Sequence, residues 1–183
     1  MKVLNKLALM FVFVASSAVV GVNAQTITGE VSNAVLEKEV QSKILRLPYY
    51  EVFDFISFRV DGDTVVLDGK VRNATNRREA EAAVKRIAGV EKVQNNIEIL
   101  NVGGFDDRIR QDLYRSLART GSLSRYLWTV NPSMRLVVDR GHVTLEGYVA
   151  NEGDLNLANI AARTVPGVFS VTNNLKVDSK RAG

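Results

Sequence analysis

The sequence predicts an α+β protein made of two tandem αββαβ domains, each a three-stranded mixed sheet covered by two helices. A strand of alternating apolar and polar residues at 65–71 recurs 78 residues later, at 143–149. When residues 60–99 are matched with residues 138–177, 14 of the 40 pairs are identical and no gap is needed. Because an isolated strand cannot bury its apolar face, the repeated unit must include the segments that pack on it.

An amphipathic helix is expected at the start of each copy. Four apolar residues recur at steps of four and three between residues 36 and 47, and Pro48 ends the pattern. Residues 105–118 carry the equivalent stripe in the second copy. Both helices should therefore lay an apolar face on their sheets.

A hairpin follows in the first copy. Residues 53–60 are rich in aromatic and β-branched side chains, and Asp61-Gly62-Asp63 has the composition of a turn before the strand at 64–71. We expect the next helix to begin at Asn76, with Glu79 completing a capping box, and Asp154 occupies the equivalent place in the second copy.

Four glycines are interpreted as structural. Gly89 and Gly167 follow the second helix of each copy, where a left-handed residue is usual, and the last strands come after them at 90–100 and 168–177. Gly69 and Gly147 lie inside strands, which favours a positive φ or a close approach by the packed helix.

The chain start is typical of a secretory signal peptide. Lys2 and Lys6 precede the unbroken apolar run 7–14, and the small residue Ala24 marks a cleavage point. The alternative, an uncleaved membrane anchor, is disfavoured because the apolar segment is shorter than the roughly 20 residues that a bilayer span needs. The expected location is the periplasm, and the absence of cysteine excludes disulfides and a lipid-bearing cysteine.

The predicted organisation has six parts. They are a signal peptide (1–24), a flexible arm (25–34), a first domain (35–101), a linker (102–104), a second domain (105–178) and a tail (179–183). Residues 25–101 carry 11 basic and 12 acidic side chains, and residues 102–183 carry 11 and 8. An anionic partner should therefore prefer the second copy.

The second copy contains an insertion. The first helices of the two copies match at an offset of 69, so nine residues are added before the second hairpin, within residues 119–135. This segment combines arginines with apolar and aromatic side chains, including the one tryptophan of the chain. The candidate residues for lipid or partner binding are Arg119, Leu123, Arg125, Tyr126, Leu127, Trp128 and Arg135.

Two interpretations of the insertion remain open. Aromatic rings and arginines are typical of a surface that contacts lipid headgroups. Small domains also need apolar surface, so the same residues could extend the core of the second domain or cover the first domain.

No catalytic constellation is visible in the sequence. There is no cysteine, and His142, the single histidine, cannot form an ordinary zinc site by itself. We therefore expect no enzyme, no metal and no cofactor. A nucleic-acid partner is disfavoured by the export signal and by the modest charge of the second copy.

The repeated motifs resemble those of the BON-domain family. The motif Leu-Asp/Glu-Gly-x-Val at 67–71 and 145–149 is followed by an alanine-bearing helix, Gly-Val, and Val-x-Asn-Asn at 93–96 and 171–174. Two such domains behind a signal peptide are similar to periplasmic, osmotically inducible proteins. The resemblance implies an αββαβ fold, no catalysis and an affinity for phospholipid membranes.

The leading functional hypothesis is a non-catalytic periplasmic module for envelope maintenance or osmotic stress response. It would bind anionic phospholipid or membrane-associated partners, chiefly through the second domain. The alternative is a protein-interaction or holdase-like module for envelope proteins without direct lipid binding.

Overall fold

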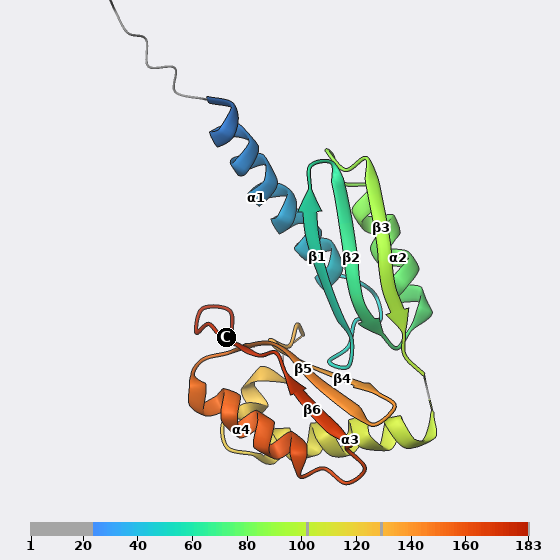
Figure 1. The fold of residues 1–183 in the computed structure, drawn as a ribbon, viewed down its shortest axis with the longest axis vertical. Coiled ribbons are helices and arrows are strands. Elements are labelled where there is room, and N and C mark those ends of the chain that lie inside the picture. The colour runs from blue at the N-terminus through green and yellow to red at the C-terminus, as the bar shows by residue number, and fades with distance from the viewer. Residues whose placement is uncertain (1–23, 102, 129, 183) are drawn as a thin grey trace, which may run out of the picture.

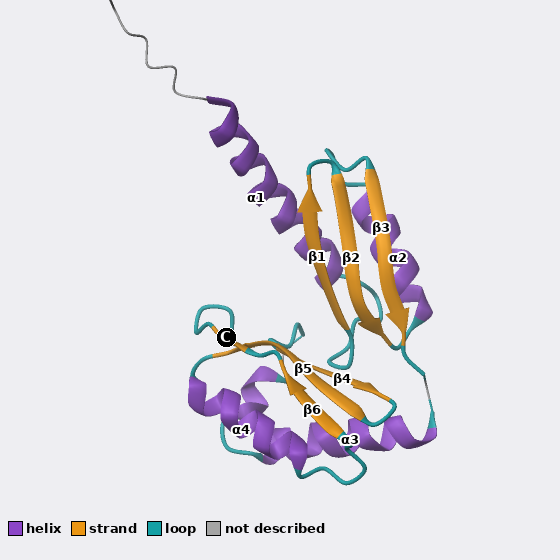
Figure 2. Ribbon diagram, in the orientation of Figure 1, coloured by secondary structure: helices purple, strands orange, loops and turns teal. Residues whose placement is uncertain are grey.

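The computed structural model describes residues 24–101, 103–128 and 130–182. Two α+β units follow one another along the chain, joined by a short connection, and the second lies across one end of the first (Figure 1). The expected signal peptide lies outside the described residues, apart from Ala24. In each unit the helices cover one face of the sheet (Figure 2).

The first unit has the expected order of elements. These are α1 (Ala24–Leu45), β1 (Phe55–Asp61), β2 (Thr64–Val71), α2 (Ala74–Lys85) and β3 (Lys92–Ile99). The sheet order is β1-β2-β3, with β1 antiparallel and β3 parallel to the central strand. The predicted three-stranded mixed sheet is thereby confirmed.

The second unit repeats this plan and adds a short 3-10 helix. Its elements are α3 (Gly104–Arg119), η1 (Leu123–Tyr126), β4 (Met134–Asp139), β5 (His142–Val149), α4 (Glu152–Arg163), β6 (Ser170–Asn173) and β7 (Lys176–Val177). The sheet order is β4-β5-β6, and β7 continues the last strand beside β5. Asn174 and Leu175 interrupt that strand.

Matching positions of the repeat form the two cores. Val65 and Leu67 of β2 are fully buried, as are Val143 and Leu145 at the same places in β5. The alanine-bearing faces of α2 and α4 pack on these strands, because small side chains let a helix lie close to a sheet. The stripe predicted on α1 is also buried.

Two expectations about helix starts are wrong. The expected flexible arm is helical, because α1 begins at Ala24, and a single glycine at residue 29 costs only about 1 kcal/mol in a helix. The N-caps are Asn73 and Asn151, three residues before the predicted positions. Asn76 and Asp154 instead lie in the first helical turn, where their side chains are buried in other contacts.

The nine inserted residues lie where the alignment placed them, between the first helix and the hairpin of the second unit. At the offset of 69, the last residue of α1 corresponds to Tyr114, whereas α3 continues for five residues to Arg119. The loop that leads to β4 is five residues longer than the loop before β1, and β4 begins one residue later than the repeat offset of 78 would place it. The insertion is thus part helix and part loop.

The predicted positive φ of the glycines is confirmed, but the segment that lies close to Gly147 is not the one expected. Gly69 and Gly147 have φ of 139° and 106°. A Cβ atom at Gly147 would overlap the carbonyl oxygen of Ser133, so the close approach comes from the preceding strand segment rather than from a helix. Gly89 and Gly167, with φ of 90° and 87°, lie in the turns after α2 and α4.

Candidate functional site

Three of the seven predicted binding residues belong to the core of the second domain. Leu123, Tyr126 and Leu127 are at most 3% exposed and pack with α3, α4 and the sheet. The insertion therefore extends the core through its first half. Leu123 and Tyr126 therefore cannot contact a partner directly, whereas Leu127 also lines the groove described below.

A buried carboxylate fixes this first half of the insertion. Asp154 accepts hydrogen bonds from the Tyr126 hydroxyl, the Ser122 hydroxyl and the Arg125 guanidinium. Burial raises the pKa of Asp154, but the hydrogen bonds from Tyr126, Ser122 and Arg125 outweigh that effect and leave the pKa below its ordinary value. Arg125, predicted as a phosphate contact, is half exposed but is paired with this buried carboxylate.

Arg135 was assigned to the binding surface, and this assignment is wrong. Its side chain is 4% exposed and points into the first domain, where the guanidinium lies 4.3 Å from the centre of the Tyr50 ring. It also donates to the carbonyl of Glu51 at 2.9 Å. Burial lowers the pKa of Arg135, since the charged form loses its hydration.

Several described residues of the insertion lie at the surface, and two of them are large and apolar. Trp128 is 68% exposed and Val130 is 95% exposed, on the loop between η1 and β4. Arg119, the last residue of α3, is exposed as well. An exposed indole is uncommon, because a tryptophan usually contributes a large buried area.

A groove lies beside this loop, between the two domains. We call it the interdomain groove. Its lining residues are Tyr50, Glu51, Val52 and Phe53 of the first domain, and Gln111, Tyr114, Arg115, Leu127, Val130 and Pro132 of the second. Most of these side chains are apolar or aromatic, so the groove joins the exposed loop to an apolar recess.

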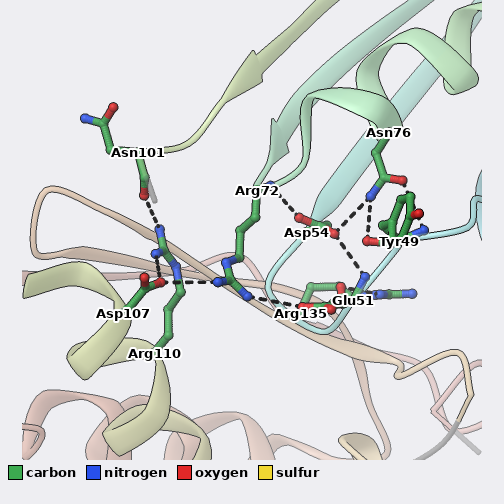
Figure 3. Close-up of polar contacts among 9 residues, drawn as sticks. All are labelled: Tyr49, Glu51, Asp54, Arg72, Asn76, Asn101, Asp107, Arg110 and Arg135. Atoms are coloured by element: carbon green, nitrogen blue, oxygen red, sulfur yellow. Dashed lines mark hydrogen bonds and ion pairs between the residues drawn. The ribbon is translucent and has the colours of Figure 1, made fainter. Parts of the chain in front are cut away.

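The loop of residues 49–54 carries the first-domain wall of the groove. The buried Asp54 carboxylate accepts from the backbone nitrogens of Glu51 and Arg72, at 3.0 and 2.6 Å, and from the Asn76 amide at 3.2 Å (Figure 3). Burial raises the pKa of Asp54, although the hydrogen bonds from the backbone nitrogens of Arg72 and Glu51 oppose the shift. The capping residue predicted at Asn76 therefore has another role, which is to hold this loop.

Ion pairs connect the two domains around the same loop. Arg72 lies between Asp107 of α3 and Glu51, with nitrogen–oxygen distances of 3.3 and 3.2 Å (Figure 3). A further ion pair between the domains joins Lys70 of β2 to Asp139 of β4 at 2.6 Å. The backbone nitrogen of Leu136 in β4 also donates to the carbonyl of Val52 at 2.8 Å.

An exposed aromatic cluster in the second domain was not predicted. Phe105, at the start of α3, and Phe169, before β6, are 50% and 70% exposed, and their ring centres lie 5.7 Å apart. The His142 ring meets Phe169 edge to face. A comparison of the two copies could have indicated this cluster, because Phe169 stands where the first copy has the charged residue Glu91.

The described residues hold neither a metal-ion cluster nor a membrane-spanning helix. Within them, no group of three or more histidine, cysteine or acidic side chains is arranged to hold a metal ion. None of the helices in residues 24–101, 103–128 and 130–182 is both long and apolar enough to span a membrane.

Comparisons with known proteins identify the repeated unit. The family model of the BON domain matches residues 32–101 and 105–179. No individually curated protein sequence matches the chain.

Two solved structures of CdsD are similar to this chain. CdsD is a structural protein of the type III secretion system of Chlamydia trachomatis. One is its C-terminal domain, with 12% identity, a TM-score of 0.31, and coverage of 77% of this chain and 96% of that one. The other has the same identity and TM-score and covers 80% and 94%. These values are too low to carry an argument about function.

The family match spans most of the chain, in two tandem regions that coincide with the two αββαβ units. BON domains are known in envelope-associated proteins and are in general non-catalytic. The chain belongs to the BON-domain family, with two tandem copies of the domain.

Proposed function

We propose that this chain is a non-catalytic module of the cell envelope that binds anionic phospholipid surfaces, chiefly through its second domain. The observation that carries the proposal is the exposed Trp128, held on a loop anchored by the buried residues before it. Indole rings favour the depth of lipid headgroups, where an apolar body and a polar N–H are both accommodated. A periplasmic location and a role in osmotic stress are parts of the same proposal.

The distribution of exposed apolar side chains supports a role for the second domain. Six large apolar residues are exposed there, whereas three are exposed in the described part of the first domain. The second domain also carries the excess of basic residues. Apolar contact and attraction to anionic headgroups therefore favour the same half of the molecule.

The arginines that could meet phosphate differ from those predicted. Arg125 is held by Asp154, and Arg135 is buried between the domains. Arg119 and Arg115, one turn apart on α3, are exposed instead. Arg115 pairs with Asp112, but this carboxylate is itself 31% exposed, whereas the Asp154 carboxylate that holds Arg125 is 9% exposed. We therefore assign the headgroup contacts to α3, beside the exposed loop.

Vesicle flotation tests the proposal. The mature chain should float with phosphatidylglycerol vesicles and not with phosphatidylcholine vesicles, and binding should weaken as salt rises because exposed charges are screened. Trp128→Ala should reduce binding about tenfold or more, since burial of a large aromatic side chain contributes about 1.5–3 kcal/mol.

Tyr49→Ala is the matched control, because Tyr49 is an exposed aromatic residue of the first domain. It should leave flotation unchanged. Failure to float with any vesicle composition would refute lipid binding and favour a protein partner. Equal losses from Trp128→Ala and Tyr49→Ala would refute the assignment to the second domain.

A further inference from the structure

The interdomain groove has the size of a ligand site. It is open to solvent and has a volume of about 630 Å³, within the range of about 300–1,000 Å³ that is usual for small-molecule pockets. Val52 and Phe53 form one wall, and Tyr114, Leu127 and Pro132 form the other. An occupant of this groove would touch both domains at once.

The walls of the groove are already fixed without an occupant. The Phe53 and Tyr114 rings meet edge to face across the domain boundary, with centres 6.4 Å apart. The carbonyl of Val52 is hydrogen-bonded to β4, and Arg135 lies against Tyr50 at the back of the same loop. A ligand therefore need not order these side chains when it binds, which removes part of the entropic cost of binding.

Positive charge lies along one side of the groove. Arg115 lines both the groove and a second cavity, of about 380 Å³, between α3 and the turn that follows α4. Arg119 lines this second cavity one turn further along the helix. The cavity has one acidic lining residue, Asp112, which is paired with Arg115, so the two arginines leave it with a net positive charge.

The charge in the groove itself is balanced. Its acidic lining residue, Glu51, is paired with Arg72 at 3.2 Å. An apolar recess thus opens beside a cationic cavity, and Arg115 is shared by both. This arrangement is complementary to a molecule with an apolar tail and an anionic head.

We propose that the interdomain groove binds one acyl chain of an individual anionic phospholipid, and that Arg115 and Arg119 hold its phosphate. The inference rests on the proposed affinity for anionic lipid and adds a defined site to it. Guanidinium groups bind phosphate through charge-assisted hydrogen bonds that can be bidentate. Lipid binding at this site depends on the docked arrangement of the two domains.

Calorimetric titration of the mature chain with short-chain phosphatidylglycerols, kept below their micelle concentrations, tests the site. Saturable binding of one lipid per chain is expected. The Kd should fall about fourfold for each methylene added to the bound acyl chain, until the groove is filled. Phosphatidylcholine of the same length should bind more weakly, because its choline offsets the phosphate charge.

Three substitutions locate the two parts of the ligand. Arg115→Gln should raise the Kd for phosphatidylglycerol about tenfold, through loss of a charged hydrogen bond. Arg108→Gln is the matched control, because this arginine is exposed on the same helix and lines neither cavity. Gln111→Trp, which places an indole in the groove from an exposed position, should abolish the dependence on chain length.

Three results would overturn the inference. Glycerol phosphate binding as tightly as the lipids would show that no acyl chain is held. Equal effects of Arg115→Gln and Arg108→Gln would remove the headgroup assignment. A chain that floats with anionic vesicles but binds no monomeric lipid would contradict the groove site and leave the proposed function standing. A chain that neither floats with vesicles nor binds monomeric lipid would contradict both the groove site and the proposed function.

Discussion

Replacing Gly147 with alanine should destabilise the second domain strongly. A non-glycine residue at a φ of 106° is strained by about 1–3 kcal/mol. The new Cβ would also overlap the carbonyl oxygen of Ser133, which accepts a 2.8 Å hydrogen bond from the backbone nitrogen of Tyr148. Moving that carbonyl removes a hydrogen bond worth about 1 kcal/mol, so the total loss is about 2–4 kcal/mol.

Differential scanning calorimetry of residues 25–183 measures this loss. For a protein of this length, about 2–4 °C of Tm is lost per kcal/mol, so the calorimetric transition of the chain should fall by about 4–16 °C. Gly62→Ala is the control, because Gly62 has a φ of 62° and nothing within 4 Å of an added Cβ. A Gly147→Ala transition that falls no further than that of Gly62→Ala would refute the steric part of the reasoning.

Two further predictions concern the contact between the domains. Phe53→Ala should lower stability by about 2 kcal/mol and separate one calorimetric transition into two, because Phe53 packs on the second-domain core. Phe58→Ala, within the first domain, should destabilise the chain but leave a single transition. A single transition in Phe53→Ala would contradict coupling of the domains through this residue. The hydrogen bond from Lys70 holds the pKa of Asp139 below its ordinary value of 3.8, so the pair stabilises the fold above pH 3.8 and this contribution is lost as the pH falls through the lowered pKa. Chemical denaturation at pH 7 and at pH 3 should therefore show a smaller loss of stability on acidification for Lys70→Met than for the natural chain, and equal losses would contradict the assignment.

The repeat made the fold predictable from the sequence. Positions that serve the backbone are shared by both copies, so Gly69 and Gly147 could be interpreted together, and their positive φ follows from the same strand geometry. The helix starts were less predictable. Asn73 and Asn76 are both good capping residues, and only the tertiary contacts of Asn76 with Tyr49 and Asp54 decide between them.

The candidate site was predictable in place but not in detail. Composition marks residues 119–135 as unusual, yet it cannot tell a buried arginine from an exposed one. Arg135 is buried because the first domain lies over β4, a contact between residues 84 apart in sequence. The interdomain groove depends on the same contact between the domains, and its lining residues come from both repeats, so the pattern of either repeat alone does not predict it.

The most direct test of the proposed function uses the fluorescence of Trp128, the one tryptophan of the chain. A chain of residues 25–183 would be titrated with phosphatidylglycerol vesicles that contain brominated acyl chains, and with matching phosphatidylcholine vesicles. The account predicts a blue shift and quenching of the emission with the anionic vesicles, both reversed by salt, because the exposed indole enters the headgroup region. Emission that stays unchanged while the vesicles and protein co-float would contradict the assignment to this loop, and absence of both signals would contradict lipid binding itself.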